Sequence, residues 1–161
     1  MNASANRPQV VFDCMVYLQA TASETSPAAA ALRLVEQGKV LLFVSREVLD
    51  EIKDVLSREK IRKLNPRIND VSLAALLKML GKHATLLKKV PIRFSYPRDP
   101  KDEPYLNLAI AANATFLVSR DNDLLDLMDW NQEEGRDFMK RFRSLKIVDP
   151  VTFLQKVAAS N

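Results

Sequence analysis

Short apolar runs that suit buried strands alternate with helical segments along the whole chain. Four of these runs are rich in β-branched and aromatic residues: 10–12, 40–44, 116–118 and 146–148. Ile92-Arg93-Phe94 predicts a further short strand. Because helical segments separate the strands, the sequence predicts a parallel sheet with right-handed crossovers. We therefore expect an α/β fold, a three-layer α/β/α sandwich with a central, mainly parallel sheet of four to five strands.

Capping residues and apolar periodicity mark the helices between these runs. Ser26-Pro27 predicts a helix that ends at Gly38, and Ser45 caps the helix that carries Glu51. The basic stretch 58–67 contains Pro66 and is expected to link two helices. The remaining expected helices begin near Cys14 and Asn69 (69–87), at Asp102, near Leu124 and Gln132, and at Asp149-Pro150.

Length and composition fit a single domain over residues 1–161, with its core at about 9–153. The chain has 161 residues, of which 47% are hydrophobic. Cys14 is the only cysteine, and no apolar stretch approaches the roughly 18 residues of a membrane span. We expect a cytoplasmic protein without a membrane segment. The net charge of +4 is compatible with a polyanionic partner or with an ordinary solvated surface.

Four acidic residues lie next to these strands and helices, far apart in the sequence. Asp13 follows the first strand directly, and Glu51 lies in the helix after the second. Asp102 begins a helix after a proline-rich loop, and Asp121 follows the strand 116–118. Ligands bind outside the carboxyl ends of the strands in open α/β sheets, so these acids are expected to converge. Converging carboxylates repel one another unless a cation joins them, which favours a hard divalent metal.

Each acid alone also has a structural explanation. Glu51 suits the solvated face of an amphipathic helix, and Asp102 suits a helix N-cap. Asp121 and Asp123 suit a tight turn around Asn122. Asp50, Asp99 and Glu103 are second choices beside the selected acids. The order of the four acids therefore carries more information than any one of them.

This order resembles the PIN domain. The matching segments are Val-Val-Phe-Asp13, Ser45-Arg-Glu-Val-Leu-Asp-Glu51-Ile, Asp99-Pro-Lys-Asp102-Glu-Pro-Tyr-Leu and Phe116-Leu-Val-Ser-Arg-Asp121-Asn-Asp123-Leu-Leu. The resemblance covers about residues 9–153. It is closest to a bacterial branch of toxin components of toxin-antitoxin pairs.

The resemblance implies a metal-dependent ribonuclease. In such an enzyme Asp13, Glu51, Asp102 and Asp121 would be the catalytic acids and would bind Mg²⁺ or Mn²⁺. Asp123 would be a further ligand or an acid that assists the ligands from outside, and Ser119 would support the site. The implied partners are RNA, a cognate antitoxin and a second copy in a homodimer. Arg98, Lys101 and Arg120 lie near these acids in the sequence and are the candidates for RNA binding, while the basic stretch 58–67 also suits a solvated helical face.

One position departs from the family pattern. That branch usually has an asparagine two residues after the first aspartate, where this chain has Met15. The alternative function is therefore a catalytically impaired PIN-like module that binds RNA or protein. Cys14 is expected to pack in the interior rather than to act as a nucleophile, because His83 lies in a helical stretch with no sign of pairing.

Overall fold

A five-stranded parallel sheet organises the part of the chain that the structure, a computed structural model, describes, residues 7–160. The strand order is β3-β2-β1-β4-β5, and every neighbouring pair is parallel. The α/β sandwich predicted from the sequence is confirmed. The strands are β1 (Gln9–Phe12), β2 (Leu41–Ser45), β3 (Thr85–Leu87), β4 (Phe116–Val118) and β5 (Lys146–Val148).

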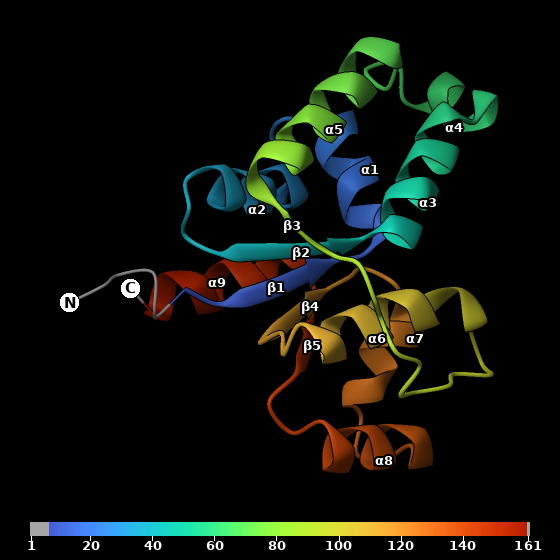
Figure 1. Cartoon of the computed structure of the whole chain (residues 1–161), viewed down its shortest axis with the longest axis vertical. Coiled ribbons are helices and arrows are strands. Elements are labelled where there is room, and N and C mark those ends of the chain that lie inside the picture. Colours follow the sequence, from blue (N-terminus) through green and yellow to red (C-terminus); the bar gives the residue numbers. More distant parts are fainter. Residues whose placement is uncertain (1–6, 161) are drawn as a thin grey trace.

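Helices cover both faces of this sheet (Figure 1). Helices α1, α2 and α5 lie on one face, and α6 packs against β1, β2 and β4 from the other. The helices are α1 (Cys14–Ala22), α2 (Pro27–Glu36), α3 (Arg46–Ser57), α4 (Glu59–Leu64), α5 (Asp70–His83), α6 (Glu103–Ala111), α7 (Asn122–Leu125), α8 (Glu133–Arg141) and α9 (Pro150–Ser160), with 3₁₀ turns η2 (Pro100–Asp102) and η3 (Asp126–Met128).

The central strand β1 has no exposed face. Val10, Val11 and Phe12 are completely buried, and Phe12 packs edge-on against Phe153 of α9. A strand covered on both faces reads as a continuous apolar run, which is why the sequence predicts it well. Its burial fixes the position of Asp13, the next residue.

The predicted helix 69–87 is shorter than expected. It begins after a capping box made by Asn69 and Ser72, but it ends at His83. Thr85–Leu87 then forms β3, whose register places Thr85 beside Phe43 of β2. The stretch 58–67 is likewise not a plain link, because residues 59–64 form α4. Two leucines in an edge strand fit the preceding helical pattern, so the sequence does not mark this boundary.

The strand predicted at Ile92-Arg93-Phe94 is wrong. The buried Asn107 of α6 takes the place of a neighbouring strand, since its Oδ1 accepts hydrogen bonds from the backbone N–H groups of Arg93 (2.7 Å) and Phe94 (2.9 Å). Its Nδ2 donates to the carbonyls of Phe94 and Glu103, both at 3.0 Å. One side chain therefore holds the irregular segment that leads to the loop before Asp102.

Replacing this side chain tests its role in the fold. We expect Asn107→Leu to lower the free energy of unfolding by about 2–4 kcal/mol, because several buried backbone groups lose their partners. Urea denaturation measures this change. Asn131→Ala, at an exposed position, is the control and should change stability by less than about 0.5 kcal/mol. Equal effects of the two substitutions would contradict the assignment.

Candidate functional site

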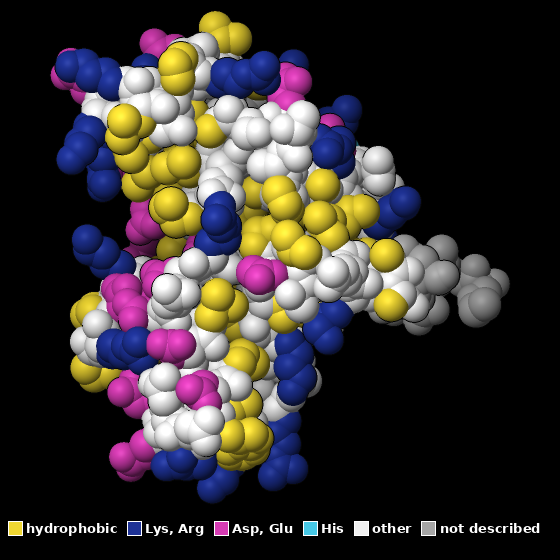
Figure 2. Space-filling view, turned by 180° about the vertical axis from the view of Figure 1, so that it is seen from behind, with side chains coloured by type: hydrophobic (Ala, Val, Ile, Leu, Met, Phe, Trp, Pro, Cys, Tyr) yellow, Lys and Arg dark blue, Asp and Glu magenta, His cyan; other side chains and the backbone are white. Residues whose placement is uncertain are grey.

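An acidic cleft of about 600 Å³ opens at the edge of the sheet where β1, β2 and β4 end. Parallel pairing brings these ends together, and α1 and α3 begin there directly after β1 and β2. The four sequence-predicted acids Asp13, Glu51, Asp102 and Asp121 all line this cleft. In Figure 2, Asp and Glu side chains gather at the indentation on the left edge of the molecule.

Asp13 is held rigidly at the floor of the acidic cleft. It is 4% exposed and caps α1, its Oδ1 accepting a hydrogen bond from the backbone N–H of Val16 (3.1 Å). The hydroxyl of Ser119 donates to its Oδ2 across the β1–β4 pair, and the same hydroxyl oxygen accepts from the N–H of Asp121 (2.9 Å). Burial raises the pKa of Asp13 from 3.8 to about 6, although these hydrogen bonds act to lower it. Ser119, which is fully buried, thus links two of the acids.

Asp102 is the least compensated acid of the site. It is 7% exposed at the N-terminus of α6, and among the described residues its Oδ2 has no hydrogen-bond partner. Burial, followed by the charges of Asp121, Asp99 and Asp13, raises its pKa from 3.8 to about 8. A buried carboxylate in this state favours binding either a proton or a cation.

A second group of carboxylates overlaps the first through Asp121. Oxygens of Asp99, Asp121 and Asp123 all lie within 4.8 Å of one another. Asp121 caps α7, and its Oδ1 accepts a hydrogen bond from the N–H of Asp123 (2.9 Å). Asp123 does not line the acidic cleft with the other four acids. Asp99 and Asp121 of this outer group both line the acidic cleft, so the outer group adjoins the buried acids there.

Glu51 approaches from α3, on the other side of the cleft. The hydroxyl of Tyr105 on α6 donates a hydrogen bond to its Oε1 at 2.6 Å. Glu51 lines the acidic cleft together with Asp13, Asp102 and Asp121, but it comes from a helix on the opposite side. Cys14 lies near Glu51 and Asp13: burial, then the charges of these two acids, raise its pKa to about 12. A thiol that stays protonated packs well and is a poor nucleophile, as expected from the sequence.

The three cations predicted to bind RNA have different surroundings. Lys101 is exposed and lines the acidic cleft. Arg98 forms ion pairs with Asp123 of the outer group (2.9 Å) and with Asp126 (2.6 Å), and its charge is therefore already engaged by two carboxylates. Arg120 is exposed and does not line the cleft, but its charge helps to lower the pKa of Asp149. Lys101 is thus the cation best placed to meet a phosphate in the cleft.

The donor set of the cleft fits a hard divalent cation. It consists of carboxylate oxygens, the ligands that Mg²⁺ and similar ions prefer. The partnerless buried oxygen of Asp102 and the raised pKa values of Asp13 and Asp102 show that these groups lack a compensating positive charge among residues 7–160. A cation would supply that charge.

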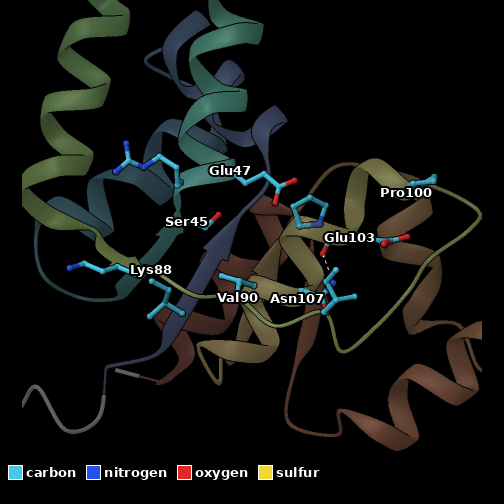
Figure 3. A pocket seen from close by; sticks show the side chains of 11 residues that line it. Ser45, Glu47, Lys88, Val90, Pro100, Glu103 and Asn107 are labelled. Carbon is cyan, nitrogen blue, oxygen red and sulfur yellow. Dashed lines mark hydrogen bonds between the residues drawn. The ribbon is translucent and has the colours of Figure 1, made fainter.

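A second hollow, of about 360 Å³, adjoins the acidic cleft. Figure 3 shows it between Ser45 and Glu47 on one side and Glu103 and Asn107 of α6 on the other, with Lys88 and Val90 after β3. Glu47 lines both hollows, so the two adjoin at the start of α3. The open space at the carboxyl edge of the sheet is therefore larger than the acidic cleft alone.

Two residues of the site were not selected from the sequence. Asp99 was ranked behind Asp102, yet it joins the outer carboxylate group. Its place before Pro100 is the available signal, because such an Asp often caps the following turn, as it does here for Lys101. Tyr105 carried no signal beyond its position one turn after Asp102.

The comparisons with known proteins agree with this geometry. The family model of the PIN domain matches residues 9–123, which include all five predicted acidic ligands. The chain belongs to the PIN domain family. PIN domains are generally nucleases that act on nucleic acid and typically use a divalent metal. The comparison with curated proteins gave no match. Among residues 7–160, no helix combines the length and the apolar composition needed to cross a membrane.

The raised pKa of Asp102 predicts how stability depends on pH in the absence of divalent ions. Because the folded-state pKa (about 8) lies above the ordinary value (3.8), protonation of Asp102 favours the folded state, and this stability is lost as pH rises toward 8. We expect Asp102→Asn to flatten this decline and to raise the free energy of unfolding at pH 7 by about 2 kcal/mol.

Denaturation between pH 5 and pH 8 in a chelator measures the effect. Asp50→Asn is the matched control, because it removes an exposed carboxylate that lines the same cleft. If the free energy of unfolding declined with pH equally in wild type and in Asp102→Asn, the pKa of Asp102 would not be raised by the fold.

Proposed function

We propose that this protein is a metal-dependent endoribonuclease. The observation that carries the proposal is the buried Asp102 carboxylate, whose Oδ2 lacks a hydrogen-bond partner among the described residues and which lies among other acids of one cleft. Membership of the PIN family supports nuclease activity, and the acidic cleft supports metal binding. We propose further that the substrate is RNA and that the ion is Mg²⁺ or Mn²⁺.

Each acid has a distinct role in this proposal. Asp13, Asp102 and Asp121 hold the ion, with Ser119 fixing the orientation of Asp13 through its hydroxyl. Glu51, oriented by Tyr105, completes the ligand set from the side of α3. Asp123 is a further ligand or outer acid, held in place by Arg98. These orienting hydrogen bonds matter because partners of metal ligands set ligand geometry and basicity.

The chemistry is hydrolysis of a phosphodiester bond. When bound, the ion lowers the pKa of a water molecule and stabilises charge on the phosphate and its leaving oxygen. Lys101 at the mouth of the cleft attracts the phosphate by its charge. The buried position of Asp13 and Asp102 keeps these carboxylates in one arrangement, so the protein contributes placement rather than covalent catalysis.

A catalytically impaired PIN-like module that binds RNA or protein is the second candidate. Met15, which replaces the asparagine usual in the toxin branch, lines the acidic cleft and is 45% exposed. An apolar side chain there offers no hydrogen bond to a substrate. This candidate requires RNA or protein binding without turnover, and the cleavage assay below distinguishes the two.

The resemblance to toxin components supports a proposal for the role of this protein in the cell. We propose a cytoplasmic toxin that forms a homodimer and is inhibited by an antitoxin peptide covering the acidic cleft. Expression of the wild-type protein alone should then arrest bacterial growth, whereas Asp102→Asn should not. Co-expression of the neighbouring gene should restore growth. Equal growth with wild type and variant would contradict a toxin role while leaving the ribonuclease proposal open to the direct assay.

Cleavage of RNA tests the proposed activity. We expect wild-type protein to cleave single-stranded RNA with Mn²⁺ or Mg²⁺ and to lose activity in a chelator. Asp13→Asn and Asp102→Asn should each lower the rate by more than about a hundredfold, because even partners of metal ligands cost about 10–100-fold when removed. Gel analysis of labelled RNA measures these rates.

The control is Asp50→Asn, which keeps the buried acids intact and should retain activity near that of wild type. Equal cleavage by wild type and by the two buried-acid variants would exclude this site as the source of the activity. RNA binding without cleavage would favour the impaired module.

A further inference from the structure

A basic pocket of about 450 Å³ lies at the opposite edge of the sheet from the acidic cleft. It is formed where α6 and α8 end and where the chain turns toward β5. Four cations line it, Arg93, Lys140, Arg141 and Arg143, and no Asp or Glu of the described chain does. Figure 2 shows Lys and Arg side chains along the lower right edge of the molecule, without acidic side chains among them.

One of the four cations has a structural role. The Nη2 of Arg141 donates a hydrogen bond to the carbonyl of Arg93 (2.9 Å), and its guanidinium lies 5.1 Å from the ring centroid of Phe142 and 5.7 Å from that of Phe94. Arg141 therefore attaches the 93–98 segment to α8. Arg93, Lys140 and Arg143 are exposed, and none of them forms an ion pair within residues 7–160.

The other basic region of the chain differs in this respect. In the stretch 58–67, Arg58, Arg62, Lys63 and Arg67 pair with acids at 2.7–3.4 Å. Their charges are largely balanced locally. In the basic pocket only Arg141 has such a partner, Asp137 at 3.9 Å, so the charges of Arg93, Lys140 and Arg143 are the less balanced ones, although the sequence draws attention to the stretch 58–67.

Helix geometry explains only part of this charge. Cations at the C-terminus of α8 interact favourably with the helix dipole, which accounts for Lys140 and Arg141. Arg93 and Arg143 lie outside that helix and come from separate segments. Side chains from different segments with one sign of charge around one hollow raise the local concentration of an anionic ligand.

The 93–98 segment connects the basic pocket with the acidic site. Arg93 lines the basic pocket, and Arg98 at the other end contacts Asp123 of the outer carboxylate group. A hollow of about 540 Å³ lies between them, lined by three arginines and two acids: Arg93, Arg98, Arg141, Glu134 and Asp137. Five residues of chain span at most about 17 Å, so a single strand that enters the acidic cleft is within reach of the basic pocket.

We propose that the basic pocket binds the phosphate backbone of the RNA strand on one side of the cleaved bond. The inference rests on the proposed ribonuclease function, because RNA is the polyanion it requires. Lys140, Arg143 and Arg93 neutralise phosphates, while Arg141 keeps the connecting segment in place. The match to the PIN domain ends at residue 123, so the α8 side of the pocket lies outside it.

The double substitution Lys140→Gln/Arg143→Gln tests the proposal by fluorescence anisotropy with a labelled single-stranded RNA of about sixteen nucleotides. A chelator prevents metal-dependent cleavage. Each lost phosphate contact lowers the slope of log K against log salt by about 0.7, so the double variant should lower it by about 1.4 and weaken binding roughly tenfold or more at low salt.

Lys78→Gln/Lys82→Gln is the matched control. Both lysines are exposed on α5, and the substitution removes the same two charges away from either cleft. The control variant should bind RNA like wild type. Equal affinity and salt slope in all three proteins, or equal losses in the two double variants, would overturn the proposal. Matching thermal unfolding of the three proteins shows that the fold is intact.

The same proteins separate this inference from the proposed activity. With Mn²⁺ present, the Lys140→Gln/Arg143→Gln variant should raise KM for the long RNA and leave kcat unchanged. Selective loss of RNA binding without cleavage by any variant would support the basic pocket and contradict the ribonuclease. Cleavage that depends on Asp102 together with unchanged RNA binding would support the ribonuclease and contradict the basic pocket.

Discussion

Parallel pairing of β1 with both β2 and β4 is the constraint on which the site depends. Because all three strands run the same way, their carboxyl ends meet at one edge, and the residues that follow them are brought together. Asp13 follows β1, and Ser119 and Asp121 follow β4. An antiparallel β4 would place Asp121 at the opposite edge. The strand topology therefore determines which acids meet in the cleft, and the side chains then determine its chemistry.

Burial of carboxylates at this edge opposes stability and favours ligand binding. Removing Asp102 from water without a hydrogen-bond partner for Oδ2 raises its pKa and lowers the stability of the charged protein. Asp13 is better compensated, because Ser119 and Val16 donate hydrogen bonds to it. The site therefore combines one acid fixed by the fold with one left available. A carboxylate oxygen left without a partner suits binding of a hard cation.

The sequence predicts the central strands and the neighbourhood of the acids, but it does not predict the irregular connection between β3 and α6. The run Val10-Val11-Phe12 is apolar because both faces of β1 are covered, and burial of this kind is readable from sequence. The alternation in Ile92-Arg93-Phe94 resembles a strand, yet its N–H groups bond to Asn107, fourteen residues from Arg93. A side chain on a later helix leaves no local signal. Asp99 lies at the end of the same irregular connection, so the sequence does not predict that its carboxylate meets those of Asp121 and Asp123.

An acidic cleft and a polyanionic substrate repel each other until a cation is bound, so productive binding needs positive charge elsewhere. Lys101 supplies one charge at the cleft, and Arg98 is already bound by two carboxylates. The stretch 58–67 is paired with its own acids and contributes little net charge. Separating the cations from the acids of the cleft avoids their mutual neutralisation. A strand held at the opposite edge of the sheet would then bring its phosphates to the acids without requiring the acidic cleft itself to attract them.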